Sequence, residues 1–302
     1  MFVSARGSVL GLLYWQWRLT TVFVISGALV AAAHQLLHLH WFTLPTTPVL
    51  VVGGALAIFV SFRTNSAYDR WWEGRKLWGQ LVNSSRHFAD QVVTYVGRGA
   101  PVDDLQRALV LRHAAYVHAL RCALRQQDLT ADEDLRRLLP ADELAAFAAR
   151  SNPTHALLER QHRELAALER AGRLTGHQLE LLDQTVRVLL DVQGGCERIK
   201  KTPIPRGYGF IANRLILAYG LLFPISLTEE LGWVIIPINV LVSLSFALIS
   251  EAGRVLEDPF TMFYNGLPLS QLSRMIEVNL REVIGDDDLP EIPQPTADGV
   301  LM

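Results

Sequence analysis

Chemistry-bearing side chains are densest in one segment, from Phe62 to Arg86, which reads FRTNSAYDRWWEGRKLWGQLVNSSR. Asn65, Asp69 and Trp72 recur there at i, i+4 and i+7, so a helix would place them on one face. Such a face can line a water-filled path where a helix leaves a membrane. The composition is equally typical of an interfacial anchor, in which tryptophan and arginine lie at headgroup depth. The residues alone leave both interpretations open.

No other group of residues predicts catalysis, a cofactor or a metal ion. Serine, histidine and aspartate are scattered without a nucleophile motif, and no glycine-rich phosphate loop is present. Cys122 and Cys196 form no CxxC pair, so we expect free thiols. His34 and His38 share a helical face, but this spacing alone is a weak metal signal, and packing or interfacial roles are expected. The sequence therefore predicts no enzyme, metal or cofactor.

The composition predicts a protein divided between lipid and water. Of the 302 residues, 50% are hydrophobic and 19% are charged, which suits neither a disordered chain nor one embedded wholly in a membrane. The formal net charge of -2 gives no general attraction to nucleic acid, so no nucleic-acid partner is expected.

Residues 1–72 predict a lead-in and a transmembrane hairpin. The stretch 19–41 holds no formal charge with neutral histidines and is long enough to span a bilayer as a helix. Pro45 and Pro48 break the chain before a second span at about 49–72. This span is apolar only in its first part, so its polar continuation must face protein or water.

The residues before the first span resemble a signal peptide only superficially. Arg6 precedes a short apolar run, but Trp15 and Trp17 interrupt the run and no small-residue cleavage site follows. We expect a retained amphipathic lead-in, with Tyr14 and the two tryptophans near the lipid headgroups.

Residues 73–206 predict a helical domain in water. Leucine and alanine recur there at helical spacing among charged residues, and no strand pattern of useful length occurs. Helix starts and breaks are expected at Asp103, Asp104, Thr130, Ser151, Thr175, Pro140 and Pro153.

Residues 207–250 predict a second transmembrane hairpin with a short linker at 228–230, near which Pro224 and Pro237 kink or shorten the helices. The C-terminal segment 251–302 contains one more amphipathic helix, at about 269–283, and then an acidic end.

The placement of basic residues predicts the topology. Loops 42–48 and 228–232 contain no lysine or arginine. The basic residues that flank the spans lie at their opposite ends: Arg6, Arg18, Arg63, Arg70, Arg75, Lys76, Lys200, Lys201, Arg206 and Arg254. By the positive-inside rule, both termini and the middle domain lie in the cytosol, as for a multi-pass protein of a plasma membrane.

Three motifs in this membrane context resemble the bestrophin family. They are FRTNSAYDRWWEGRKLWGQLVNSSR, GGCERIKKTPIPRGYGFIANRL and SEAGRVLEDPFTMFYNGLPL. The resemblance implies an all-α membrane protein with four transmembrane helices per subunit and a helical cytosolic domain. Five identical subunits would form a ring around one pore, which passes chloride and other small ions.

The resemblance also implies where the pore narrows. Residues spaced by four along the second span line a hydrophobic neck in the family, and counting back from Arg70 places them at Phe62, Ile58 and Gly54. Gly54 departs from the bulky pattern and suggests a shorter gate or a wider mouth. A cytosolic constriction is expected at Val186, with the neighbouring Leu189 or Leu190 as alternatives.

The sequence leaves open whether the channel passes anions or cations. Chloride is the expectation from the family, but Glu229 and Glu230 would form acidic rings at the external mouth, which favours a monovalent cation channel as the alternative. A transporter or membrane enzyme is less favoured, because Arg214 is the only charge within the spans that could serve it.

Calcium activation is not expected. In calcium-regulated members, an acidic run follows the segment equivalent to Glu257–Phe260, whereas TMFYNGLPL follows it here. The later residues Asp286, Asp287 and Asp288 are expected to form a solvated turn rather than a calcium site.

Overall fold

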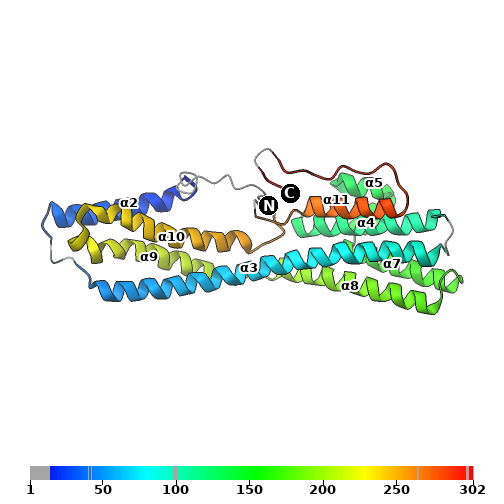
Figure 1. The fold of residues 1–302 in the computed structure, drawn as a ribbon, viewed down its shortest axis with the longest axis horizontal. Helices are drawn as coiled ribbons and strands as arrows, with labels where there is room; N and C mark the ends of the chain where they lie inside the picture. The colour runs from blue at the N-terminus through cyan, green and yellow to red at the C-terminus, as the bar shows by residue number, and fades with distance from the viewer. Residues whose placement is uncertain are drawn as a thin grey trace. The chain divides into compact units, whose positions relative to one another are not determined.

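A computed structural model of the chain describes residues 14–39, 41, 43–97, 101–263, 265–296 and 299–301 (Figure 1). The predicted all-helical architecture is confirmed within these ranges. The chain divides into two compact units. Among the described residues, we call those from Tyr14 to Trp71 together with Pro203–Glu257 the apolar unit, and those of Trp72–Thr202 and from Asp258 onward the polar unit.

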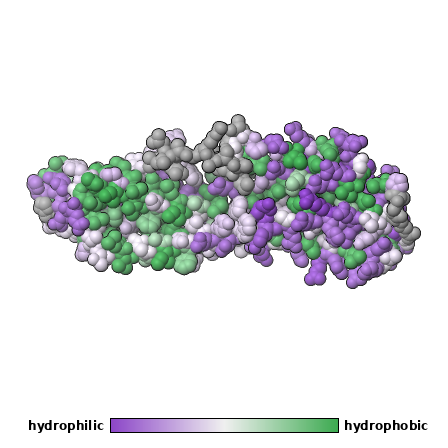
Figure 2. Space-filling view, viewed as in Figure 1, coloured by the Kyte–Doolittle hydropathy of each residue, from purple (hydrophilic) through white to green (hydrophobic). Residues whose placement is uncertain are grey.

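The apolar unit is built from long helices rich in exposed apolar side chains. In the described residues these are α2 (Trp17–Gln35), the first part of α3 (Thr46–Gln91), α9 (Arg206–Leu231), the 3-10 turn η3 (Gly232–Val234) and α10 (Ile235–Leu256). Helical stretches Trp17–Gln35, Thr46–Val96 and Gly207–Leu256 are long and apolar enough to cross a membrane. Figure 2 shows hydrophobic residues gathered over this unit.

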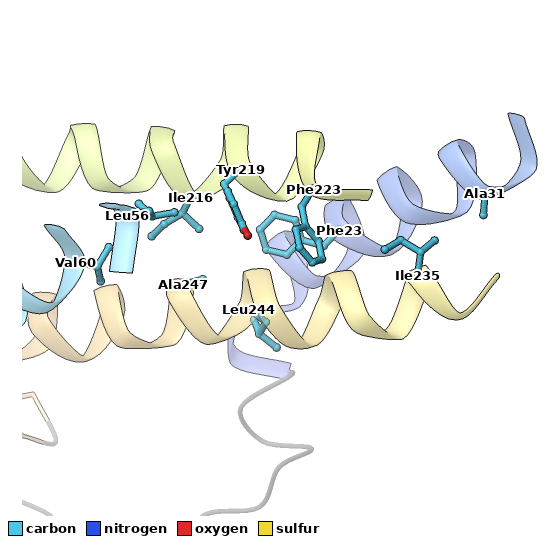
Figure 3. Packing of buried hydrophobic residues seen from close by; sticks show 10 residues of the cluster. All are labelled: Phe23, Ala31, Leu56, Val60, Ile216, Tyr219, Phe223, Ile235, Leu244 and Ala247. Atoms are coloured by element: carbon cyan, nitrogen blue, oxygen red, sulfur yellow. The ribbon is translucent and has the colours of Figure 1, made fainter. Parts of the chain in front are cut away.

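An aromatic cluster forms the core of the apolar unit (Figure 3). Phe23 of α2 lies between Tyr219 and Phe223 of α9 and residues of α10, and the Tyr219 ring meets the Phe246 ring edge-on at 5.6 Å. A Cβ atom at Gly220 would lie 2.3 Å from the Phe23 ring, so α9 and α2 pack this closely only because residue 220 has no side chain.

A buried asparagine of α10, itself held by a serine of the same helix, links α10 to α2. The Asn239 side-chain amide of α10 donates to the Phe23 carbonyl at 2.9 Å, and Ser243 Oγ donates to Asn239 Oδ1 at 3.0 Å. An unpaired amide in apolar surroundings would cost several kcal/mol, on the order of the water-to-hydrocarbon transfer free energy. These hydrogen bonds therefore both satisfy Asn239 and set the register of α10 against α2.

The first hairpin differs from its predicted boundaries. Helix α2 ends at Gln35 rather than at 41, and His38 lies beyond it with a left-handed φ of 52°. The expectation that His34 and His38 share a helical face is therefore wrong; His34 is buried within α2, whereas His38 is not helical. Helix α3 continues past 72 to Gln91, because no proline or glycine cap interrupts its pattern.

The second hairpin turns later than predicted. The expected linker at 228–230 belongs to the last turn of α9, since Glu229 and Glu230 are good helix formers. The chain leaves the helix at Gly232, whose φ of 52° favours glycine. Pro237 lies in the first turn of α10, where the missing N–H breaks no helical hydrogen bond.

The polar unit continues α3 and adds shorter amphipathic helices. They are the π-helix η1 (Val92–Val96), α4 (Asp104–Arg125), η2 (Leu129–Ala131), α5 (Glu133–Leu138), α6 (Ala141–Ala148), α7 (Pro153–Arg170), α8 (Gly176–Lys201) and α11 (Leu269–Val283). The bounds of α11 confirm the predicted amphipathic helix.

Local capping decides where these helices begin. Asp103 and Thr175 form capping boxes with Gln106 and Gln178, which confirms two predicted starts. The Asp103 side chain accepts a hydrogen bond from the Gln106 N–H, which, together with Arg173, lowers the pKa of Asp103. Two other predicted starts are wrong. Asp132 caps α5 instead of Thr130, and Asn152 caps α7 instead of Ser151, because each aspartate or asparagine oxygen reaches the N3 amide.

Helix α4 is enclosed on nearly all sides by the polar unit. It packs against α5, α7, α8 and α11, and the Tyr116 hydroxyl donates to the Leu189 carbonyl of α8 at 3.1 Å. The predicted free thiols are confirmed: Cys122 and Cys196 are unpaired and buried. Burial raises the pKa of Cys196 to about 12, so this thiol stays protonated at neutral pH.

Candidate functional site

Helix α3 presents two different faces within the apolar unit. On one face Gly53, Leu56 and Val60 are buried against α9 and α10. A Cβ at Gly53 would lie 2.7 Å from the Tyr219 hydroxyl, so this face approaches α9 as closely as a glycine permits. The opposite face is left uncovered by the described chain.

The three predicted neck residues lie on that uncovered face. Ile58 is 60% exposed and Phe62 is 69% exposed. No atom lies within 4 Å of the position that a Cβ of Gly54 would take. Because four residues advance a helix by little more than one turn, the three positions lie in one line along the helix, and we call the exposed face that carries them the α3 row. The three residues that the family resemblance implies for the neck therefore share one exposed face of α3.

The α3 row becomes polar further along the helix. Asn65 and Asp69, which follow Phe62 on the same face, are exposed, and Trp72 at the start of the polar unit is also exposed. One continuous helix therefore carries an apolar stretch and then a polar stretch on a single exposed face. An apolar ring repels water when narrow, whereas amide and carboxylate groups hold it, so this order suits a gate followed by a wet chamber.

A buried arginine sets the rotation of α3, and sequence reasoning missed this role. Arg63 Nη1 donates to Ser250 Oγ of α10 at 2.8 Å, and its Nη2 donates to Glu257 at 2.6 Å. Arg70 Nε donates to the Glu257 carbonyl at 2.7 Å. The sequence predicts Arg63 only as a positive charge that flanks a span. Its position in an otherwise apolar run was the available signal, since a membrane-buried arginine needs partners.

The Arg63 contacts determine which side chains form the α3 row. Ser250 and Glu257 lie at the end of α10, and Thr64 Oγ1 donates to the Ile249 carbonyl at 3.1 Å. These contacts anchor adjacent residues of α3 to α10. A rotation of α3 that buried Phe62 would break them, so they hold the apolar row outward.

The predicted cytosolic constriction falls on α8. Val186 is 7% exposed and lies beside α7 at a cavity of about 300 Å³. Leu190, one turn further along, lines the same cavity and is 42% exposed, whereas Leu189 is fully buried under α4. Of the three positions considered for this constriction, Leu190 offers most of its side chain to another molecule.

The acidic residues predicted for an external mouth end α9. Glu229 and Glu230 are both exposed, and each lies within the last turn of the helix rather than in a loop. Negative charge at a helix C-terminus is unfavourable by itself, so no helix-stabilising role explains the pair.

The polar unit contains a buried cluster of potential metal ligands that is better described as an ion-pair network. His118 lies between Asp134 and Glu277, with 2.8 Å from its Nε2 to the Glu277 carboxylate. The carboxylates also pair with Arg121, Arg137, Arg274 and Arg281. Burial alone would raise the pKa of Asp134, but His118 and Arg274 hold it below its usual value. Because these cations already occupy the carboxylate oxygens, a metal ion would have to displace them.

In the turn after α11, Asp287 and Asp288 are exposed to solvent, as predicted, whereas Asp286 is tied to the polar unit. Asp286 pairs with Arg107 of α4 and lies 3.9 Å from Arg281. This carboxylate therefore closes the end of α11 against α4.

The fold and the α3 row define a helical protein with membrane-length apolar helices and an uncovered apolar-to-polar face. The sequence family of bacterial and fungal bestrophin proteins matches residues 1–282. A voltage-dependent anion channel-forming protein of Mesorhizobium japonicum is 34% identical over 286 residues, covering 95% of this chain and 89% of that protein. Another, from Ralstonia nicotianae, is 36% identical over 293 residues, covering 96% and 92%.

The fold is likewise similar to solved bestrophin structures. A crystal structure of a bacterial bestrophin homolog from Klebsiella pneumoniae is 31% identical, with a TM-score of 0.81, and the match covers 89% of this chain and 98% of that chain. The chain belongs to the bestrophin family, as its three motifs predicted. Family membership makes it a membrane protein and an ion channel rather than an enzyme.

Proposed function

We propose that the protein is an anion channel that passes chloride and other small monovalent ions through a fivefold axial pore. Five copies would form a ring, with the α3 row of each copy turned toward the axis. The relatives are named as anion channel-forming proteins, which supports the conduction of anions. The uncovered α3 row supports the pore, because a channel needs one helix face that its own subunit does not fill.

The α3 row is the observation that carries the proposal. Phe62 and Ile58 would form two apolar rings that close by dewetting, and Gly54 would leave a wider mouth. The polar continuation at Asn65 and Asp69 would begin an inner vestibule formed by the helical domain 73–206. Val186 or its exposed neighbour Leu190 would form the second constriction, and Glu229 with Glu230 would surround the external mouth.

The proposed topology has four membrane-spanning helices in each subunit. These are α2, the first part of α3, α9 and α10, so that hairpins 1–72 and 207–250 flank the cytosolic domain and 251–302 follows on the cytosolic side. Both termini would lie in the cytosol of a bacterium, with the channel in its inner membrane. Native mass spectrometry of the purified protein should give a mass five times that of the subunit; a monomer would contradict the axial pore.

Measurement of the reversal potential tests which ion the channel passes. Purified protein in planar bilayers under asymmetric NaCl should give a reversal potential near the chloride equilibrium potential. A complete absence of current would contradict the channel itself.

A cation channel of the same architecture is the second candidate. Glu229 and Glu230 at the mouth, with Asp69 on the α3 row, are exposed carboxylates that attract cations, and the row has no basic residue from Gly54 to Phe62. A reversal potential near that of sodium would favour this candidate over the anion channel.

Alanine substitution tests the neck. Ile58→Ala and Phe62→Ala together should raise the open probability or leak, because smaller rings no longer exclude water. Val52→Ala is a matched control, since Val52 is apolar and exposed on α3 but lies off the row. Unchanged current in the double variant, or an equal change in the control, would rule out these residues as the gate.

A further inference from the structure

A cavity of about 360 Å³ lies in the apolar unit among α2, α9 and α10. Its walls are apolar on one side, where Leu19, Ile216, Leu217 and Ala247 line it; Ile216 and Ala247 face each other across the packed helices in Figure 3. Its other side is polar and is formed by Gln16, Asn213, Arg214 and Glu251. The cavity is separate from the α3 row, and no residue of the proposed neck lines it.

Three hydrogen-bond donors at this cavity have no acceptor among the described residues. The Arg214 guanidinium makes one contact there, with the Phe210 ring at 5.1 Å. Asn213 Oδ1 accepts from Ser250 Oγ at 3.2 Å, which leaves its amino group without an acceptor. The side-chain amide of Gln16 likewise has no partner within the described part of the chain. A cluster of unmatched donors with a positive charge is complementary to an anion.

The one carboxylate at the cavity is already neutralised. Glu251 accepts two hydrogen bonds from Arg254, at 2.7 Å from Nε and 2.5 Å from Nη2. The uncompensated charge at the cavity is therefore that of Arg214. Glu251 and Arg254 together add no net charge that would repel an anion.

The position of Arg214 along α9 indicates where that anion comes from. At about 1.5 Å per residue, the helix from Arg214 to Leu231 spans about 26 Å, close to the thickness of a hydrocarbon core. Arg214 then lies at the depth of the inner-leaflet headgroups, where arginine side chains reach the lipid phosphates. A free inorganic anion would leave the apolar wall of the cavity uncovered.

We propose that this cavity binds a membrane phospholipid. Its phosphodiester accepts hydrogen bonds from Arg214, Gln16 and Asn213, and its acyl chain packs on Leu19, Ile216 and Leu217. The site goes beyond ion conduction, although it rests on the proposed membrane topology. It does not depend on which ion the channel passes, so a failure of the lipid site and a failure of the pore are distinguishable.

Binding of a short-chain phospholipid tests the site. Detergent-purified protein is titrated with dioctanoyl phosphatidylglycerol, with dioctanoylglycerol, which lacks the phosphate, and with inorganic phosphate, and binding is followed by native mass spectrometry and thermal unfolding. The phospholipid should bind and raise the unfolding temperature. Dioctanoylglycerol and inorganic phosphate should each bind at least about tenfold more weakly, because each lacks half of the contacts.

Substitution of Arg214 supplies the decisive comparison. Arg214→Gln should weaken phospholipid binding about tenfold or more, and Arg214→Lys should restore part of it. Arg18→Gln is the matched control, since Arg18 is also an exposed interfacial arginine over an aromatic ring but does not line the cavity. Its binding should equal that of the unaltered protein. Because Arg214 is exposed, the lipid-free unfolding temperature of Arg214→Gln should not change.

Three results would overturn the proposal. Equal phospholipid binding by Arg214→Gln and the unaltered protein would exclude Arg214 as the phosphate ligand. Binding of inorganic phosphate as strong as that of the phospholipid would assign the cavity to a free anion. Absence of phospholipid binding by the intact protein would exclude the cavity as a phospholipid site.

Discussion

The two units of the molecule treat polar groups in opposite ways. The polar unit buries His118, Asp134 and Glu277 in a network of ion pairs and exposes charged residues to solvent. The apolar unit exposes isoleucine, leucine and phenylalanine and holds its core together with packed rings and a few hydrogen bonds, such as that of Asn239. Among the described residues of the apolar unit, Arg63 is the main buried charge, and it pairs with the Glu257 carboxylate.

This difference matches the proposed topology, in which the polar unit meets water and the apolar unit meets lipid. In water, burial of apolar surface drives folding, and the interior tolerates charges when every one is paired. In lipid, apolar side chains gain nothing by burial, so close packing around small residues such as Gly220 and Gly53 must supply the contacts. The comparison predicts that charge substitutions damage the polar unit most, whereas added methyl groups damage the apolar unit.

Removal of a buried carboxylate should have the largest effect. Glu277→Leu leaves His118, Arg137 and Arg281 facing an apolar side chain, and should lower the free energy of unfolding by about 3–5 kcal/mol. Urea unfolding in detergent measures the change. Glu180→Leu is the control, since this carboxylate is exposed on α8 and should matter by less than about 0.5 kcal/mol. If Glu277→Leu lowered the free energy of unfolding by less than about 1 kcal/mol, the polar unit would not depend on its buried ion pairs.

Acid should destabilise the polar unit through His113. Burial lowers the pKa of His113 from 6.5 to about 4 in the folded protein. Between these values the unfolded chain binds a proton that the folded chain does not, so stability falls as the pH drops from 6.5 toward 4, by about 3 kcal/mol in total. Unfolding measured at pH 7 and pH 4.5 should show this loss. The loss of stability should largely disappear in His113→Leu and persist in His155→Gln. If the unfolding free energy of His113→Leu fell with pH as steeply as that of the unaltered protein, His113 would not be its cause.

Adjacent glycines on α3 should respond oppositely to an added methyl group. Gly53→Ala places a Cβ 2.7 Å from the Tyr219 hydroxyl, within a packed aromatic cluster, and should cost about 1–3 kcal/mol. Gly54→Ala meets no atom and gains helix propensity, so its stability should be unchanged or higher by up to about 1 kcal/mol. Thermal unfolding in detergent compares the two, and equal losses would show that the α3 row is not an open face of the subunit.

Loss of a helix cap should have the smallest effect. Asp103→Ala removes the hydrogen bond to the Gln106 N–H and should cost about 1 kcal/mol of polar-unit stability. Asp103→Asn keeps this acceptor and should recover most of the loss. Asp104→Ala is a control, because it removes a negative charge from the first turn of α4 and leaves the cap intact. If Asp103→Asn were as unstable as Asp103→Ala, the ion pair with Arg173 rather than the cap would be responsible.

Features with a local cause were predictable residue by residue. Helix α11 and the starts of α4 and α8 agree with prediction, because amphipathic periodicity and capping boxes act within a few residues. The starts at Thr130 and Ser151 were misplaced because a nearby aspartate or asparagine competed for the same amides. The second hairpin turns at Gly232 rather than at 228–230, because Glu229 and Glu230 continue the helix and glycine readily adopts the positive φ of the turn.

Features made by distant residues were not predictable in this way. The network around His118 joins α4, α5 and α11, and none of these segments signals it alone. The cavity at Arg214 needs α2 and α10 beside α9 before its donors converge. Val186 and Leu190 line the same cavity beside α7, but only the packed structure shows that Val186 is buried and Leu190 is exposed.

The sequence by itself determined the all-helical class and the bestrophin family. It also predicts the division between lipid and water and, through the family resemblance, the row of Gly54, Ile58 and Phe62. Periodicity, hydropathy and motifs are properties of neighbouring residues, so they can be read along the chain. Only the tertiary structure decided which face of α3 is open. That choice depends on Arg63 reaching Ser250 and on Gly53 admitting Tyr219, which are contacts between segments far apart in the chain.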